Sequence, residues 1–479
     1  MSNHKKNLYD NSIIFIVAYF NNKMECYVYM KNHTTDMTVG NPVKHIIIFA
    51  LPALIGNIFQ QVYNLADSVI VGRFVGADAL AAVGATGSIT FLFFALCNGI
   101  GSGGGIIVSQ FYGAHDDEKV KQSIANTGMI MLIVPVVFGL IGYISAESFL
   151  RLLSTPESIL YDASAYVRYM CIGLLFVSLY NYITAMLRAL GDSKSPLYFL
   201  ILSAIINVFL DILLVYVYSM GIRGAAIATI ISQFIAAATC GIYAYKVNPY
   251  FKLKKADLVF IPYLAKKIIR LGVPMSLQFA LIAISGMAVQ RIVNNYGTVV
   301  VAAFTATCRI EQLIHQPYTT LSASIATFCG QNYGANKLDR VNEGYKKGVI
   351  IMVCITIVMM ISMQLFGGAI TAMFVSDPEI IALGARGLRT TSLFYLALGM
   401  IYVVRGVLTG IGDAFFAMFN GVVEVLGRFT VPILLTQYMG LGAIGIWIST
   451  GIVWFLSGST AWLRLYTNFI LKNNINKRK

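Results

Sequence analysis

Residues 110–114 read QFYGA, and residues 331–335 read QNYGA, 221 positions later. Further stretches match at this separation or within one residue of it: Gly76 with Gly297, Gly191-Asp192 with Gly412-Asp413, Gly221 and Gly224 with Gly442 and Gly445, and Thr155-Pro156-Glu157 with Asp377-Pro378-Glu379. A separation that recurs over most of a chain indicates an internal duplication. The sequence therefore predicts two similar halves.

Long apolar segments lie between these matches. The sequence is 57% hydrophobic and only 12% charged, whereas about 25% of the residues in a soluble domain are charged. Runs such as 126–149 and 349–375 exceed the roughly 20 residues that span a bilayer, and in hydrocarbon such runs must form helices. We predict an all-α integral membrane protein with twelve helices, near 46–72, 83–110, 124–147, 164–189, 196–219, 222–246, 265–291, 298–328, 346–374, 386–409, 412–437 and 442–468.

The net charge of +14 comes mainly from Lys and Arg in short loops and tails. The connection 246–270 alone carries seven of them. Because cytoplasmic loops are enriched in Lys and Arg, we expect both termini in the cytoplasm of a bacterial cell, in a multi-pass protein of the cytoplasmic (inner) membrane. This distribution explains the charge without nucleic acid as a partner.

Six helices per half is an even number, so both halves enter from the same side, as parallel repeats around a central cleft. Met37 begins a natural lead into the first helix, so we interpret 1–36 as either a disordered tail or an artefact of an upstream start codon. The predicted segments are a cytoplasmic tail (1–43), an N-terminal six-helix bundle (44–246), a cytoplasmic linker (247–264), a C-terminal six-helix bundle (265–468) and a basic cytoplasmic tail (469–479).

Motifs of common enzymes are missing from the sequence. It contains no P-loop, HExxH or GxSxG motif, and its seven cysteines show no CxxC spacing. These patterns would mark nucleotide hydrolysis, metalloprotease, serine hydrolase or zinc chemistry. We therefore expect neither an enzyme nor a cofactor.

Buried ionisable residues are the first candidates for function, because charge inside a membrane is costly. Asp67 lies in the first predicted helix, and Asn207 and Asp211 lie one turn apart on the fifth. Thr229, in the sixth helix, falls at a depth similar to that of Asp211. Two carboxylates with an amide and a hydroxyl can share a proton, or they can supply hard oxygen ligands to a small cation. The weaker interpretation is that these side chains only hydrogen-bond helices together.

The doubled Gln-x-x-Gly-Ala signature, the two sets of six helices and the stretch LRALGDSKSP at 187–196 resemble the multidrug and toxic compound extrusion (MATE) family. The resemblance covers about 42–468. It implies an antiporter that expels amphipathic, often cationic compounds in exchange for H⁺ or Na⁺. The sequence leaves the choice of ion open, and we expect a monomer whose other partner is membrane lipid.

The resemblance is to the DinF-like branch of that family and implies roles for particular residues. Asp67, Asn207, Asp211 and Thr229 match its N-lobe cation site, and they would be the ligands if the ion is Na⁺. Tyr63 lies one turn before Asp67. Pro52 matches the proline at which the first helix bends in the proposed mechanism.

The second half does not repeat this pattern, because Ala288, Arg428 and Pro432 stand at the positions of Asp67, Asn207 and Asp211. Its ionisable residues can either line the cleft or form structural pairs, and Glu424 with Arg428, four residues apart, is interpreted as such a pair. The expected substrate cleft includes Gln60, Gln61, Tyr180, Gln278, Arg309, Glu311 and His315. The alternative function is a flippase for lipid-linked precursors, which would need cationic cleft residues such as Arg309, Arg405 and Arg428.

Overall fold

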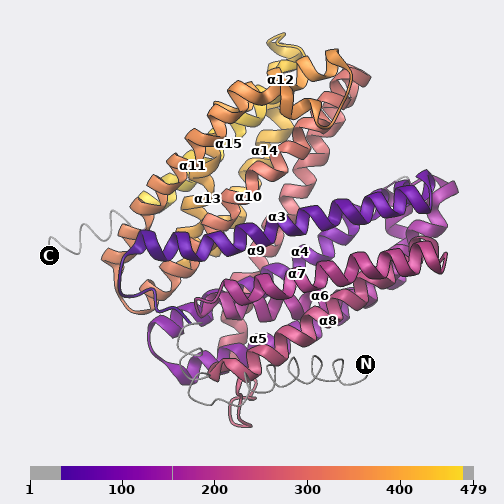
Figure 1. Cartoon of the computed structure of the whole chain (residues 1–479). Coiled ribbons are helices and arrows are strands. Elements are labelled where there is room, and N and C mark those ends of the chain that lie inside the picture. The colour runs from indigo at the N-terminus through magenta and orange to yellow at the C-terminus, as the bar shows by residue number, and fades with distance from the viewer. Residues whose placement is uncertain (1–33, 154, 468–479) are drawn as a thin grey trace, which may run out of the picture.

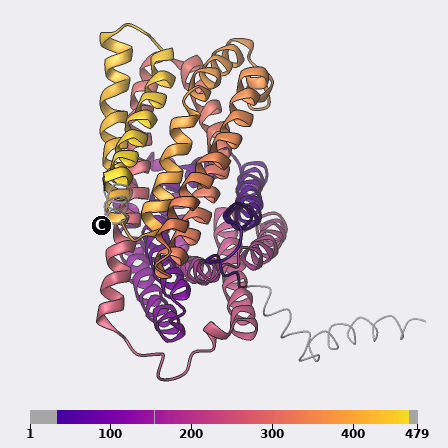
Figure 2. The same ribbon diagram turned by 90° about the vertical axis from the view of Figure 1, so that its left-hand side faces the viewer.

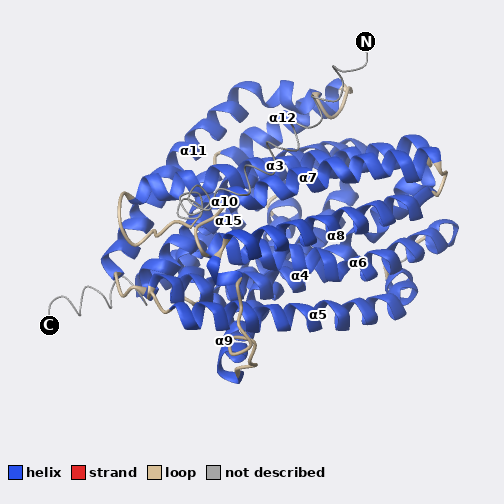
Figure 3. Ribbon diagram, turned by 60° about the horizontal axis from the view of Figure 1, so that its bottom comes forward, coloured by secondary structure: helices blue, strands red, loops and turns tan. Residues whose placement is uncertain are grey.

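The computed structural model describes residues 34–467 except Ser154. Residues 1–33 of the segment 1–36 and the whole predicted tail 469–479 lie outside the described residues. Within them the chain forms helices joined by loops, without strands (Figure 3). The N-terminal helices (indigo to magenta) and the C-terminal helices (orange to yellow) form two groups, which diverge from the end where α3 begins (Figures 1 and 2). We call that end the inner end.

Each half contains six membrane-spanning segments. The first half consists of α3 (Pro42–Phe74), α4 (Ala77–Gly113), α5 (Asp117–Leu152), α6 (Glu157–Ala189), α7 (Lys194–Asp211) with its π-helical continuation η1 (Ile212–Val217), and α8 (Gly221–Val247). After a linker with the short helix η2 (Pro249–Phe251), the second half consists of α9 (Pro262–Val293), η3 (Asn294–Tyr296), α10 (Thr298–Gly334), α11 (Leu338–Ala372), α12 (Pro378–Ser392), α13 (Tyr395–Gly410), α14 (Ala414–Ile433), η4 (Leu434–Tyr438) and α15 (Ile444–Leu465).

These segments are long enough to cross a bilayer. Among the described residues, nine helices are apolar and long enough to do so by themselves, and α12 with α13 makes a tenth span. The remaining two, α9 and α10, have 32 and 37 residues, which exceeds the roughly 20 that a bilayer needs. The predicted fold of twelve helices in two bundles is confirmed.

One predicted helix is wrong, because the segment 386–409 is not continuous. The chain bends by 52° between α12 and α13. At the bend, the amide of Gln364 on α11 donates to the backbone oxygen of Arg389 at 2.8 Å and to the hydroxyl of Ser392 at 2.8 Å. A side chain that occupies a carbonyl of the helical ladder is a recognised cause of a sharp break.

The internal repeat is also visible in the backbone. Gly191 and Gly412, 221 residues apart, follow the inner ends of α6 and α13 with φ of 86° and 92°. Glycine adopts this left-handed conformation without the penalty that a Cβ would impose, so it commonly ends a helix. The π-helical segments η1 and η4 likewise lie at corresponding places in the two halves. The matches therefore mark repeated turns of a doubled scaffold.

The first helix of each half packs between the two bundles. α3 packs against α7 of its own half and α10 of the other, and α9 packs correspondingly against α14 and α4. The α4–α9 contact is especially close, because a Cβ added at Gly103 would lie 2.6 Å from the backbone nitrogen of Gly272. Nearby, Ser276 donates to the carbonyl of Leu96 at 2.7 Å. Small residues permit this approach of two membrane helices.

Candidate cation site and membership of a transporter family

The outer part of the N-terminal bundle brings two carboxylates together. Asp67 lies on α3 and Asp211 is the last residue of α7, directly before the π-helical turn of η1. α3 and α7 pack against each other, and the two carboxyl groups lie close enough to interact electrostatically. Two carboxylates so close repel each other unless a proton or another cation lies between them.

The polar atoms around this pair are buried without protein partners. Asp211 is fully buried and Asn207, one turn earlier on α7, is 2% exposed. Both carboxylate oxygens of Asp211, Oδ1 of Asp67, and the amide oxygen and nitrogen of Asn207 have no hydrogen-bond partner. A buried polar atom without a partner costs roughly 1–3 kcal/mol, so this arrangement favours an additional ligand or a shared proton.

Two tyrosines lie close to the acid pair. Tyr63, one turn before Asp67 on α3, and Tyr166, on α6, both lie close enough to Asp67 and Asp211 to interact electrostatically. Tyr166 is 7% exposed. We did not predict Tyr166, because a tyrosine in an apolar helix has no sequence pattern that separates it from ordinary core residues.

Thr229, the last residue of the predicted set, lies on α8, which packs against α7. Its hydroxyl donates to the carbonyl of Ala225, four residues earlier, at 3.1 Å. The hydroxyl oxygen keeps lone pairs with which it can still accept a bond or bind a cation. The predicted site residues therefore all lie on α3, α7 and α8.

The chemistry of this donor set is that of hard oxygen ligands. Carboxylate, amide and hydroxyl oxygens suit a proton or a small hard cation, whereas Zn²⁺ and Cu⁺ prefer nitrogen and sulfur. No group of three or more His, Cys, Asp or Glu side chains in the part of the chain that the structure describes could hold a metal ion. The residues fit H⁺ or Na⁺ equally well.

Pro52 lies in the inner half of α3, and the helix continues through it. Because proline has no backbone N–H, the carbonyl of Ile48 lacks its usual partner there and the helix is weakened. Asp67 lies about 22 Å further along the same helix, at 1.5 Å per residue. The helix that carries Asp67 is therefore weakened at Pro52.

The predicted cleft residues of the first half and of α9 lie in different surroundings. Gln60 is exposed and Gln61 half-buried on α3. Tyr180 is buried, and its hydroxyl donates to the carbonyl of Pro196 at 3.1 Å, which connects α6 to α7. Gln278 is 4% exposed, and its side chain lies against Gly421 on α14. The contacts of Tyr180 and Gln278 are those of helix packing.

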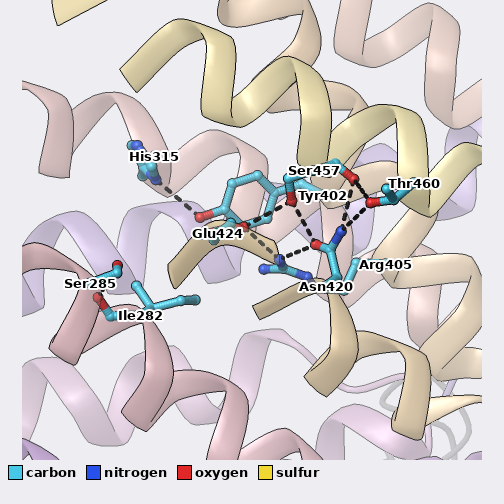
Figure 4. Close-up of polar contacts among 9 residues, drawn as sticks. All are labelled: Ile282, Ser285, His315, Tyr402, Arg405, Asn420, Glu424, Ser457 and Thr460. Carbon is cyan, nitrogen blue, oxygen red and sulfur yellow. Dashed lines mark hydrogen bonds and ion pairs between the residues drawn. The ribbon is translucent and has the colours of Figure 1, made fainter. Parts of the chain in front are cut away.

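The C-terminal bundle contains a buried ion pair, shown in Figure 4. Our pairing of Glu424 with Arg428 is wrong, because Glu424 accepts from Arg405 of α13 at 3.1 Å. Asn420 accepts from Arg405 at 3.0 Å and from Ser457 at 2.9 Å, and donates to the Ser457 carbonyl at 2.8 Å. A contact between helices thus replaces the expected contact within one helix, and the network joins α13, α14 and α15.

The remaining predicted residues of this bundle lie on α10. The Nδ1 of His315 is 3.0 Å from the hydroxyl of Tyr402, and Arg309 is exposed. Glu311 is half-buried and lies within electrostatic range of Arg428, which stands where the first half has Asn207. Within its described residues the C-terminal bundle therefore has charges of both signs, but no pair of carboxylates comparable to Asp67 and Asp211.

Comparison with known families decides where this architecture belongs. A family model described as MatE matches residues 52–213 and 274–433, once in each half. The chain belongs to the MATE family. The match covers most of both bundles, so the resemblance predicted from the doubled signature is confirmed. As a member of this family the chain is a multi-pass membrane transporter and not an enzyme.

Relatives of this MATE protein include two from Bacillus subtilis (strain 168). The "Probable multidrug resistance protein YpnP" is 32% identical over 89% of this chain and 96% of its own length. The "Probable multidrug resistance protein YoeA" is 30% identical over 84% of this chain and 88% of its own length. The similarity thus extends over nearly the whole of both relatives.

Solved structures share the fold. One described as "Crystal structure of MATE in the bent conformation" has a TM-score of 0.86 at 23% identity, covering 92% of this chain and 99% of that chain. Another, described as "Crystal structure of MATE in the straight conformation", also has a TM-score of 0.86 at 23% identity, covering 93% and 100%. At this level of identity the likeness establishes the arrangement of the helices.

Proposed function

We propose that this MATE protein is a secondary active multidrug exporter that expels amphipathic or cationic compounds in exchange for inward-moving H⁺ or Na⁺. The observation that carries the proposal is the acid pair of half-buried Asp67 and fully buried Asp211, with the unpartnered Asn207 beside it. The names of the two Bacillus relatives, both probable multidrug resistance proteins, support export as the direction.

The proposed coupling step acts on α3. A cation that enters from the outer side neutralises Asp67 and Asp211 and removes their repulsion. α3 then bends at Pro52, the space in the N-terminal bundle shrinks and the substrate leaves outward. The solved MATE structures described as bent and straight support two shapes for such a protein.

The proposed setting is the bacterial cytoplasmic membrane, with both termini inside and the protein acting as a monomer. The Lys and Arg of the inner-end loops support this orientation. We propose no cofactor besides the coupling ion. The ligands of the ion, if it is Na⁺, are Asp67, Asn207, Asp211 and Thr229.

The rival function, a flippase for lipid-linked precursors, would use a cationic cleft to hold phosphate groups. Arg405 is a poor candidate for this role, because Glu424 neutralises it at 3.1 Å. Arg428 lies within range of Glu311, and Arg309 is left as the exposed cation. The charges therefore favour the exporter.

The test uses purified protein in liposomes that contain a fluorescent cationic dye, with pH and sodium gradients imposed separately. The proposal expects dye movement driven by at least one gradient. Dye movement that neither gradient accelerates, together with translocation of a fluorescent lipid-linked phosphate, would replace the exporter with the flippase.

A further inference from the structure

The doubled signature that first revealed the repeat makes a doubled contact between the bundles. The side-chain amide of Gln110, near the inner end of α4, donates to the carbonyl of Gly410, the last residue of α13, at 2.9 Å. The side-chain amide of Gln331, near the inner end of α10, donates to the carbonyl of Ala189, the last residue of α6, at 3.1 Å. Donors and acceptors are both related by the 221-residue repeat, so one contact occurs twice, in opposite directions.

The glycine of each signature makes this approach possible. A Cβ added at Gly113 would overlap the carbonyl oxygen of Gln331, and a Cβ added at Gly334 would overlap the carbonyl oxygen of Gln110. The three atoms nearest to each added Cβ belong to the opposite bundle. Each glycine therefore permits the inner ends of α4 and α10 to cross in direct backbone contact.

A short segment before α3 strengthens one of the two contacts. The backbone nitrogen of Met37 donates to Oε1 of Gln331 at 2.8 Å, and the carbonyl of Met37 accepts from Asn332 and Arg340, each at 3.1 Å. Two residues earlier, the nitrogen of Thr35 donates to the carbonyl of Leu190 in the other bundle at 3.1 Å. Residues 35–38 thus bridge both bundles, and they involve Gln331 but not Gln110.

Because α4, α6, α10 and α13 end there, these contacts lie at the inner end, where the bundles converge (Figure 1). A transporter that exposes its substrate site to alternate sides must separate its bundles at this end in one state and join them in the other. The side-chain bonds of Gln110 and Gln331 connect opposite bundles, so opening of the inner end breaks both. Each then leaves a helix-terminal carbonyl without its present donor, which water can satisfy only after opening.

We propose that Gln110 and Gln331 are gating residues, whose paired bonds to Gly410 and Ala189 hold the inner end closed, with residues 35–38 as a latch on the Gln331 side. The inference rests on the proposed alternation of the two bundles, but it concerns the closed inner end itself. It assigns to the doubled signature a role in the conformational equilibrium, separate from cation binding at Asp67 and Asp211.

The size of the effect follows from the bonds lost. A net contribution of about 0.5–1.5 kcal/mol per hydrogen bond corresponds to roughly a 2- to 10-fold change in the ratio of open to closed molecules. Gln110→Ala removes one cross-bundle bond. Gln331→Ala removes the other cross-bundle bond, to Ala189, and also the acceptor of the Met37 N–H, so it opens the inner end further than Gln110→Ala. Gly334→Ala opens it as well, because the added methyl group overlaps Gln110 only when the bundles are joined.

The experiment measures distances between two spin labels at the inner end. Cysteines replace Glu118 and Asp339, exposed residues at corresponding positions of the two bundles, in full-length protein whose seven native cysteines are changed to alanine. The matched control is Gln364→Ala, because Gln364 donates to Arg389 and Ser392 within the C-terminal bundle alone. Size-exclusion profiles establish that each variant is folded and monodisperse before labelling.

The proposal expects the fraction of molecules with the longer label-to-label distance to increase in Gln110→Ala and to increase further in Gln331→Ala. This fraction also increases in Gly334→Ala, and it stays at the wild-type value in Gln364→Ala. Distances that stay the same in both glutamine variants and in Gly334→Ala would overturn it, as would equal broadening in Gln364→Ala. If a glutamine variant fails to fold, Gly334→Ala alone decides between these outcomes. The distance measurement needs neither substrate nor ion gradient. A failure of the gating proposal can therefore be told apart from a failure of the proposed export.

Discussion

Asp211 and Pro432 occupy corresponding positions in the two halves, each within two residues of the π-helical end of its helix, yet only Asp211 faces a second carboxylate. A proline side chain offers neither charge nor oxygen to a cation. The halves share turns, glycines and helix ends, but they differ at the buried acids. We infer a symmetric scaffold with the coupling chemistry in the first half.

Substitution of His315 tests whether the second half takes part in coupling. His315→Gln removes the imidazole that contacts Tyr402 but keeps a polar side chain on α10. If coupling resides at Asp67 and Asp211, the variant keeps its dependence on the imposed pH or sodium gradient in the liposome assay. A loss of gradient dependence, with dye binding retained, would place a coupling group in the C-terminal bundle.

The ion pair of Arg405 and Glu424 gives a prediction about stability. Their side chains are 14% and 7% exposed, and removal of one partner of a buried pair costs about 3–5 kcal/mol, whereas apolar replacement of both is often nearly neutral. We expect Glu424→Leu and Arg405→Met each to lower the midpoint of thermal unfolding in detergent. The double variant should have a higher midpoint of thermal unfolding than either single variant. Additive losses would contradict an interacting pair.

Close packing of α4 on α9 gives a second prediction about stability. Gly103→Ala places a methyl group against the backbone of Gly272, and overpacking of this kind costs about 1–3 kcal/mol. The unfolding midpoint should fall. Gly87→Ala on the same helix is the control, because a Cβ there meets nothing within 4 Å and alanine favours the helix. Equal midpoints in the two variants would refute the close contact.

Pro52→Ala separates cation binding from movement of α3. Alanine restores the N–H that can bond to the carbonyl of Ile48 and stiffens the helix. We expect gradient-driven dye efflux to slow by about tenfold, equivalent to 1.4 kcal/mol in the barrier, while equilibrium binding of the coupling ion is retained. An unchanged efflux rate would argue against bending at this residue.

Much of the fold could be predicted from residue types, because apolar runs in a membrane must form helices and the repeat fixes their arrangement. The break after Ser392 could not be predicted, since it depends on the side chain of Gln364, which reaches it from another helix. The partner of Glu424 could not be predicted for the same reason. Spacing along one helix favoured Arg428, whereas Arg405 approaches from a neighbouring helix.

At the candidate site, Asp67, Asn207 and Asp211 stood out because charged and amide groups are rare in apolar helices. Tyr166 did not, because tyrosine is common in membrane helices and its proximity to the acids depends on the packing of α6. The glutamines of the doubled signature were visible as a repeat. Their role appears only when helix ends that are far apart in sequence are brought together.

Gradient-driven dye efflux by Asp67→Asn in liposomes tests the central claim most directly, measured beside wild type and the control Asp162→Asn, in which an exposed acid of α6 is changed in the same way. Asparagine keeps the shape and oxygen of the side chain but removes its charge. The account predicts that wild type and Asp162→Asn respond to the pH or the sodium gradient and that Asp67→Asn does not. Efflux by Asp67→Asn with the wild-type gradient dependence would contradict it.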